Sequence, residues 1–374
     1  MCGITGIVAF RPEGKPFQQQ VGNALQTLHQ RGPDHQAEET YRHVTLGHAR
    51  LAVIDTSNAG NQPMTDPTGR YTIVFNGEFY NFRKLRQQLE QQGVVFQSQS
   101  DTEVLLQLYI RRGPVCLRSI NGFFSLAIYD RELDTLFMAR DRLGIKPLLY
   151  YQDQDKLIFA SEMKAMLAYT IPREIDRVSL FAYLQLNYTP APNSMIRGVE
   201  KLLPGHYRLI RDCSSGNPIV EERQYYQIPE KPDVAKMVDA ESYQGAQKRL
   251  VKLLRESVRA RMVSDVPLGA FLSGGIDSSV IATLATDYHS NLQTFSIGYQ
   301  DEPRFDETEY AELVARKIGS HHTTFKLSHE DLFEHLHQVL DYLDEPFADS
   351  SALPVYILSQ RTRNAVTVAL SGDG

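Results

Sequence analysis

The spacing of apolar residues divides the chain into two parts of different character. In about the first 200 residues, short apolar or alternating runs predict many strands and few helices. The predicted strands lie at residues 3–10, 44–54, 71–75, 123–129 and 135–139 and near Leu157 and His206, and the predicted helices at 17–29 and 101–112. This mixture predicts two packed antiparallel sheets covered by helices.

From residue 241 onwards, helical and strand patterns alternate. The predicted strands lie at 266–272, 293–297, 323–327 and 366–370, and the predicted helices at 241–262, 280–285, 307–318, 331–342 and 353–363. Such alternation is typical of a parallel sheet with helices on both faces, whose ligands bind beyond the carboxyl ends of the strands. In the first of these helices an apolar stripe is predicted to face the core, namely Ala246, Leu250, Leu253, Leu254 and Val258.

Between the two parts, residues 211–240 have no periodicity and contain loop signals such as the Ser-Ser-Gly-Asn-Pro run at 214–218. We therefore predict a first domain at 2–210, a linker at 211–240 and a second domain at 241–374. A length of 374 residues with a hydrophobic content of 42% is sufficient for two cores.

Charge, hydropathy and cysteine content exclude several function classes. A formal net charge of −6 argues against nucleic acid or a membrane surface as the partner. No apolar run approaches the ~18 residues that cross a bilayer, and there is no recognisable signal peptide. The three cysteines are far apart, which predicts no zinc site and a reducing, cytoplasmic location.

The loop at 271–279 is the strongest chemical signal in the second part. Its two glycines allow a tight turn against a ligand, and the helix that follows offers N–H groups to an anion. Hydroxyl donors come from Ser273, Ser278 and Ser279, and Asp277 beside a phosphate indicates a Mg²⁺ ligand. The alternative is an ordinary strand-to-helix turn with an Asp or Ser cap. The loop resembles the pyrophosphatase loop of enzymes that split ATP into AMP and pyrophosphate.

Cys2 follows the initiator methionine, which is usually removed before a small residue. Cys2 would then be N-terminal and would carry both a thiol nucleophile and an α-amine. The pKa of that amine, near 7.7–8.0, would let it act as the base. The alternative is an incidental small residue after the start.

Six motifs in the first part bear on this choice, because together they resemble the class II glutamine amidotransferases, which are N-terminal-nucleophile hydrolases. They occur in the family order at residues 1–4, 31–34, 48–51, 76–81, 100–103 and 140–148. The resemblance implies an αββα sandwich with Cys2 as the nucleophile that releases ammonia from glutamine. It also implies that the Asn76 side chain and the Gly77 N–H stabilise the oxyanion.

The same resemblance assigns the residues that hold glutamine. Arg50 is expected to pair with the substrate carboxylate, while Asp101 and the region of Glu78 hold its ammonium. The full expected set is Arg50, Leu51, Ala52, Val53, Ile54, Asn76, Gly77, Glu78 and Asp101. His48 is expected to be structural. The alternatives are a surface cation for Arg50, a plain helix cap for Asp101 and a hairpin turn for Asn76-Gly77.

Both parts together resemble the glutamine-hydrolysing asparagine synthetases, with further motifs at 294–298, 305–307, 344–351 and 370–374. This resemblance implies an ATP-pyrophosphatase domain with Asp277 holding Mg²⁺. Its expected ATP site is Leu272, Ser273, Gly274, Gly275, Asp277, Ser278, Ile297, Ser371 and Gly372. The loop at Asp349 is expected near the acceptor or, alternatively, as a capped loop before a helix. His321 and His322 are expected at the surface and not at a metal.

The sequence ends at Gly374 inside a motif that continues in the family with an acidic pair and a helical region, so we expect an incomplete second domain. The implied reaction is amidation of aspartate to asparagine through a β-aspartyl-adenylate, with release of AMP and pyrophosphate. The alternatives are amidation of another carboxylate, such as a sugar acid, and a non-catalytic regulatory or scaffold role. The expected small molecules are glutamine, aspartate, ATP and Mg²⁺, and a homodimer is compatible with this reading.

Overall fold

The computed structural model describes residues 2–228 and 243–372, which fall into two compact units. The first unit is Met1–Ile228 with Asp344–Ala348, and the second is Pro229–Leu343 with Asp349–Gly374. Predictions that concern Met1, residues 229–242 and residues 373–374 lie outside the described residues. Within the described ranges, no helix is both long enough and apolar enough to cross a membrane.

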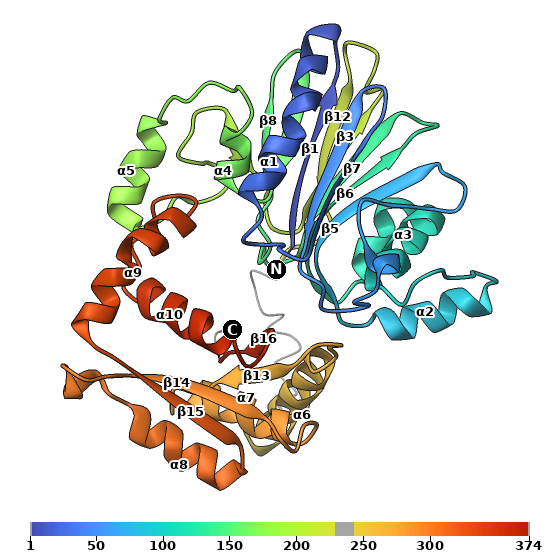
Figure 1. Ribbon diagram of the computed structural model, residues 1–374. Helices are drawn as coiled ribbons and strands as arrows, with labels where there is room; N and C mark the ends of the chain where they lie inside the picture. The colour runs from blue at the N-terminus through green and yellow to red at the C-terminus, as the bar shows by residue number, and fades with distance from the viewer. Residues whose placement is uncertain (1, 229–242, 373–374) are drawn as a thin grey trace. The chain divides into compact units, whose positions relative to one another are not determined.

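Two antiparallel six-stranded sheets form the body of the first unit (Figure 1). The strand order is β10-β8-β9-β1-β3-β2 in one sheet and β12-β11-β7-β6-β5-β4 in the other. The first sheet consists of β1 (Gly3–Ala9), β2 (His35–Thr40), β3 (Val44–Arg50), β8 (Leu149–Gln152), β9 (Lys156–Ala160) and β10 (Val199–Lys201). The second consists of β4 (Met64–Thr65), β5 (Tyr71–Phe79), β6 (Gly122–Asp130), β7 (Thr135–Arg140), β11 (His206–Arg211) and β12 (Ile219–Gln224).

The two sheets share an apolar core between their facing sides. Val8 of β1 and Leu46 of β3 belong to one buried cluster with Val74 of β5 and Met138 of β7. Because successive residues of a strand point to opposite faces, Ile7 lies in a separate cluster, on the outer side of the first sheet. Burial on both faces accounts for the nearly continuous apolar runs in these central strands.

Helices cover the outer sides of both sheets and complete the predicted αββα sandwich, which is confirmed. Helices α1 (Val21–Thr27) and α4 (Met163–Leu167) pack on the first sheet through the cluster that contains Ile7. Helix α3 (Asp101–Arg112) packs on the second sheet, where Tyr109 stacks on Phe137 with 4.8 Å between the ring centroids. The remaining helical segments are η1 (Pro12–Gln20), η2 (Asn58–Gly60), α2 (Phe82–Gln91), η3 (Gly113–Ser119) and α5 (Arg177–Leu186).

The alternative of a hairpin turn at Asn76-Gly77 is wrong, because β5 continues through both residues to Phe79. Glycine is needed here for space: a Cβ on Gly77 would lie 2.3 Å from the Phe123 carbonyl oxygen on β6. The described part of the predicted linker also contains regular structure. Strand β12 pairs with β11, and the first compact unit extends to Ile228.

The second unit contains a parallel sheet of order β15-β14-β13-β16, as predicted. Its strands are β13 (Leu268–Phe271), β14 (Gln293–Tyr299), β15 (His321–Leu327) and β16 (Val368–Leu370). Its helices are α6 (Tyr243–Arg261), α7 (Ile276–Thr286), η5 (Pro303–Phe305), α8 (Thr308–Ile318), α9 (His329–Tyr342) and α10 (Ala352–Thr362).

Helices lie on both faces of this sheet, which confirms the predicted layering. Ala270 packs with α6 and α7, whereas its neighbour Phe271 packs with Leu358 of α10 on the opposite face. The predicted core stripe of α6 is only partly right. Val258 is buried, but Leu250 and Leu253 are 57% and 55% exposed, because α6 packs on the sheet only near its C-terminal end.

Candidate functional site

Cys2 lies directly before β1, a central strand of the first sheet, and next to the end of β3. The register pairs Gly3 with Ala49, so the chain after β3 passes Cys2, and the Leu51 N–H donates to Cys2 Sγ at 3.4 Å. Burial raises the pKa of the Cys2 thiol because desolvation disfavours the thiolate. The charge of the N-terminal amine, the hydrogen bond from Leu51 and the charges of Lys146 and Arg50 act in the opposite direction.

The Arg-Gly-Pro-Asp motif holds the backbone on both sides of this thiol. Arg31 Nε donates to the Cys2 carbonyl oxygen at 2.9 Å, and its Nη1 donates to Glu162 Oε1 at 2.7 Å. Asp34 Oδ2 accepts a hydrogen bond from the Ala52 N–H at 2.8 Å. The motif thus positions Cys2 and the loop that faces it.

Asn76 is fully buried on β5 and lines the same cavity as Cys2 and Gly77. Its Nδ2 lies 3.5 Å from Ser161 Oγ, and its Oδ1 has no hydrogen-bond partner among the described residues. Ser161 Oγ also accepts the Ile4 N–H at 3.0 Å. The Nδ2 group has two donor hydrogens and Ser161 takes one of them, so the second can donate to a ligand in the cavity.

Arg50 is the last residue of β3 and is only 5% exposed, so the alternative of a surface cation is wrong. Its Nη1 donates to the Ser57 carbonyl oxygen at 2.8 Å and to Asn61 Oδ1 at 2.6 Å, and its Nη2 donates to the Asp55 carbonyl oxygen. Burial lowers the pKa of the guanidinium. The loop after β3 therefore fixes this cation in the cavity wall.

Asp101 is the first residue of α3, but Ser100 is the side chain that caps the helix, by accepting the Thr102 N–H at 3.1 Å. Asp101 Oδ2 instead accepts the Phe79 N–H at 3.1 Å and faces the cavity. Burial raises the pKa of Asp101 to about 7, with a smaller contribution from the charge of Glu78.

The structure brings most of the predicted glutamine site into one cavity. Its wall includes Arg50, Leu51, Val53, Ile54, Asn76, Gly77, Glu78 and Asp101. Ala52 does not line it, since its N–H is directed to Asp34. His48 lies outside this wall and is fully buried, with Nε2 3.1 Å from the Phe75 carbonyl oxygen. Desolvation lowers the pKa of His48 to about 3, so the ring is neutral.

Several residues of this cavity gave no signal in the sequence. Gln62 Oε1 accepts the Phe75 N–H at 2.6 Å and its Nε2 donates to Thr102 Oγ1 at 3.2 Å, which ties β5 to α3 next to the site. Lys146 and Phe123 also line the cavity. Lys146 belongs to the motif at 140–148, whose role the sequence pattern alone did not indicate.

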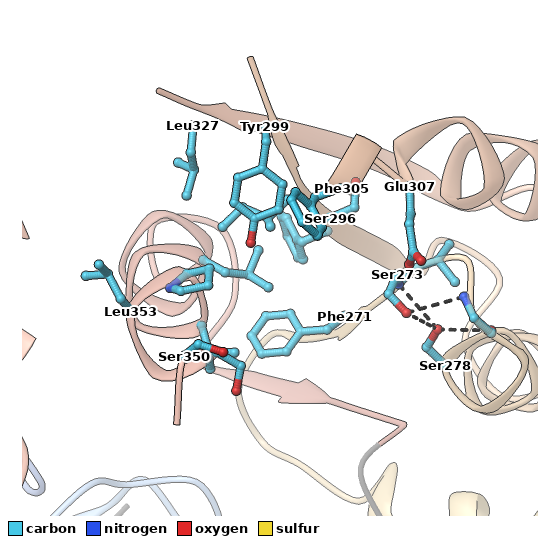
Figure 2. A pocket seen from close by; sticks show the side chains of 18 of the residues that line it. Phe271, Ser273, Ser278, Ser296, Tyr299, Phe305, Glu307, Leu327, Ser350 and Leu353 are labelled. Atoms are coloured by element: carbon cyan, nitrogen blue, oxygen red, sulfur yellow. Dashed lines mark hydrogen bonds between the residues drawn. The ribbon is translucent and has the colours of Figure 1, made fainter. Parts of the chain in front are cut away.

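The second unit contains a cavity of about 770 Å³ at the carboxyl ends of β13 and β14 (Figure 2). Of the predicted ATP site, Leu272, Ser273, Gly275, Asp277, Ser278, Ile297, Ser371 and Gly372 line it. Gly274 does not. Its φ of +84° favours glycine, and a Cβ would lie 2.5 Å from Tyr310 Cβ.

Two of the three serine hydroxyls of the loop form a hydrogen bond with each other. Ser273 Oγ and Ser278 Oγ are 3.0 Å apart, and the Gly275 N–H donates to Ser273 Oγ at 3.3 Å (Figure 2). Ser279 does not line the cavity. The loop is therefore pre-shaped around the start of α7, where N–H groups and the helix dipole favour an anion.

Asp277, in the first turn of α7, also lines this cavity. Within residues 2–228 and 243–372, no cluster of three His, Cys, Asp or Glu side chains could hold a metal ion. A single carboxylate nonetheless fits Mg²⁺, which proteins commonly bind through one or two carboxylates together with substrate phosphates.

Asp349 and His322 do not lie where the sequence placed them first. Asp349 is exposed outside the cavity and accepts the Ser351 N–H at 2.8 Å, which matches the alternative of a capped loop before α10. The prediction of a surface position is wrong for His322. This ring is half-buried, with Nδ1 2.9 Å from Thr294 Oγ1 and Nε2 3.1 Å from Ser296 Oγ.

Comparison with known proteins agrees with this arrangement. A glutamine amidotransferase domain family matches residues 1–226, and an asparagine synthase family matches residues 249–374. Asparagine synthetase (glutamine-hydrolyzing) 1 of Bacillus subtilis is 35% identical over all of this chain and 58% of its own length. A putative asparagine synthetase (glutamine-hydrolyzing) 2 of Methanocaldococcus jannaschii is also 35% identical, over all of this chain and 74% of its own length.

More distant similarity extends to proteins of other names. A Penicillium rubens protein named amidase chyE is 29% identical over all of this chain and 58% of its own length. The chain thus spans little more than half the length of the Bacillus and Penicillium relatives. The assignment rests on the two family matches, in this order, and on the archaeal relative, of which this chain covers nearly three quarters. The chain belongs to the family of glutamine-hydrolysing asparagine synthetases.

Proposed function

We propose that the first unit hydrolyses glutamine and supplies ammonia for the amidation of aspartate. The observation that supports this most directly is the single cavity that joins the Cys2 thiol, the Asn76 amide, the Arg50 guanidinium and the Asp101 carboxylate. These are a nucleophile, an oxyanion donor and one counter-charge for each end of an amino acid.

In the proposed reaction, the proton of the Cys2 thiol first passes to the α-amine of the processed N-terminus. Cys2 Sγ then attacks the side-chain amide carbon of glutamine. The carbonyl π electrons move to oxygen, which Asn76 Nδ2 and the Gly77 N–H stabilise. Return of these electrons expels ammonia, protonated by the α-ammonium, and leaves a thioester that water hydrolyses to glutamate. Arg50 and Asp101 hold the substrate carboxylate and ammonium throughout.

We place ATP in the cavity of the second unit, with its phosphates at the start of α7 and Mg²⁺ on Asp277. Bound Mg²⁺ would neutralise phosphate charge and favour departure of pyrophosphate. Activation of the acceptor as an acyl-adenylate is needed because a carboxylate is a poor electrophile. Aspartate is proposed as the acceptor from the names of the Bacillus and Methanocaldococcus relatives. A reducing compartment such as the cytosol would keep the Cys2 thiol reduced.

The test is one incubation of the protein, after removal of Met1, with glutamine, aspartate and MgATP. Glutamate and ammonia report the first reaction, and AMP and asparagine report the second. Glutamine that remains intact in the presence of all components would contradict the proposal, as would glutamate formation that does not depend on Cys2. Replacing aspartate by other carboxylates in parallel incubations tests the choice of acceptor.

Replacement of Asn76 by alanine is expected to lower kcat for glutamine hydrolysis by about 10²–10³-fold, the usual loss for one oxyanion donor. The KM for glutamine should change much less, because this hydrogen bond strengthens in the transition state. Steady-state glutamate release measures both constants. Asn76→Asp, which keeps the shape but loses the NH₂ group, should be at least as impaired, because its carboxylate would repel the oxyanion. A higher KM at an unchanged kcat would exclude the oxyanion role.

The affinity for glutamine is expected to weaken as the pH falls below about 7, the pKa of Asp101. Burial raises this pKa, so Asp101 is protonated below it and cannot attract the substrate ammonium. KM measured from about pH 5.5 to pH 8.5 should therefore rise toward the acidic end. In Asp101→Asn the KM should be high at every pH and this step should disappear. A step of the same size in the variant would assign it to another group.

A further inference from the structure

Lys146 is a buried lysine in the glutamine cavity that has no part in the reaction proposed so far. Only 4% of the residue is exposed, and its Nζ lies 4.3 Å from the centre of the Phe123 ring. It lines the same cavity as Cys2, Asn76 and Glu78. Lysine is among the residues least often fully buried, so its position in this wall needs an explanation.

The loop that contains Lys146 is organised around one carboxylate. Asp141, itself 1% exposed, accepts hydrogen bonds at 2.9–3.2 Å from the backbone N–H groups of Phe124, Leu143, Ile145 and Lys146. Arg140 Nε donates to the Lys146 carbonyl oxygen at 2.8 Å. The motif at 140–148 therefore forms a rigid loop that places one ammonium in the cavity.

The other cations and anions near Cys2 show which charge the Lys146 ammonium can act on. Arg50 is already engaged by four acceptors of the loop after β3. Burial lowers the pKa of Lys146 to about 8, with help from the charge of Arg31, which still leaves Lys146 largely protonated at pH 7. The other charged groups that face Cys2 or Lys146 are the N-terminal amine, Arg31 after α1, Glu78 on β5, Asp101 on α3 and Asp141 in the loop itself.

We propose that the Lys146 ammonium helps to stabilise the thiolate of Cys2 at neutral pH, together with the N-terminal amine and Arg50. The inference deepens the proposed glutaminase function and rests on it, but it concerns the charge state of one thiol and can be tested without glutamine. Burial alone disfavours the thiolate, whereas a fixed cation in the same cavity favours it. Cys2 would thus be held reactive before the substrate arrives.

The test is the pH dependence of Cys2 alkylation by iodoacetamide in the protein after removal of Met1. Cys116 and Cys213 are 1% and 0% exposed, so the label should be on Cys2, which peptide mass spectrometry verifies. In Lys146→Met the apparent pKa of alkylation should rise by about one unit, the lower end of what a nearby charge contributes. Lys146→Arg, which keeps the charge, should restore most of this shift.

Lys156 provides a matched control, since it is another buried lysine that packs on an aromatic ring, 4.0 Å from the centre of Phe17, but outside this cavity. Lys156→Met should leave the alkylation profile unchanged. An unchanged profile in folded Lys146→Met, or a change in the KM for glutamine alone, would overturn the proposal. If Lys146→Met does not fold, Lys146→Gln makes the same comparison. If the apparent pKa of alkylation rises in Lys146→Met as expected but the wild-type protein hydrolyses no glutamine, the glutaminase function would be refuted instead.

Discussion

Cys2→Ala is expected to abolish glutamate release from glutamine, with a loss of more than about 10³-fold in kcat. Among the described residues that line the cavity, two have hydroxyl side chains, but both are tied to the start of α3: Ser100 Oγ accepts the Thr102 N–H and Thr102 Oγ1 accepts Gln62 Nε2. Neither carries its own base, as Cys2 does with its α-amine, so neither should replace the thiol. Removing the nucleophile of a comparable covalent mechanism costs several orders of magnitude, since the two-step path through an acyl-enzyme is lost. Glutamate measured by a coupled assay over long incubations gives the residual rate.

Cys116→Ala is the matched control for this variant. Cys116 is also a thiol of the first unit, but it is buried in η3 and away from the cavity. Its replacement should change stability slightly and leave kcat unaffected. If Cys2→Ala retained wild-type glutamate release while Cys116→Ala lost it, the nucleophile would have been assigned to the wrong residue. Binding of ATP should be the same in both variants, because Cys2 and the nucleotide loop belong to different units.

Central strands of the first unit could be predicted from the sequence, whereas edge strands could not. Strands such as β1 and β6 are buried on both faces and therefore form continuous apolar runs. Strands β2 and β12 are the last strands of their sheets, and their sequences, His-Gln-Ala-Glu-Glu-Thr and Ile-Val-Glu-Glu-Arg-Gln, are mostly polar. An edge strand exposes much of its surface, so polar side chains replace the apolar pattern.

The chemical groups of the site could be named from the motifs, but the groups that support them could not. Cys2, Arg50 and Asn76 belong to motifs that a family resemblance identifies. Ser161, by contrast, touches Asn76 across 85 positions of sequence, and an isolated serine has no pattern that predicts such a contact. Long-range contacts of this kind depend on strand order and register, which follow from the whole fold.

In Asp277→Asn, the Mg²⁺ dependence of ATP binding is expected to disappear. Asp277 lies in the first turn of α7, where the helix start favours phosphate but a carboxylate repels it. With Mg²⁺ present, the wild-type carboxylate should bind the metal that bridges to the phosphates, and the variant should bind ATP at least about tenfold more weakly, ~1.4 kcal/mol. With EDTA the variant should bind ATP as tightly as the wild type or more tightly, because it has lost a negative charge that repels the phosphates.

The difference between the Mg²⁺ and EDTA results separates a metal ligand from a structural residue. Substitution of a structural residue would weaken ATP binding equally in both conditions. Isothermal titration with ATP, with and without Mg²⁺, measures the affinities, and glutamine hydrolysis should persist in the variant. Asp287→Asn is the matched control, since Asp287 caps the other end of α7 and pairs with Arg255 at 3.3 Å, outside the cavity. Wild-type affinity in both conditions is expected there. Equal weakening of Asp277→Asn with Mg²⁺ and with EDTA would leave Asp277 as a residue of the helix start and remove the metal from the proposed mechanism.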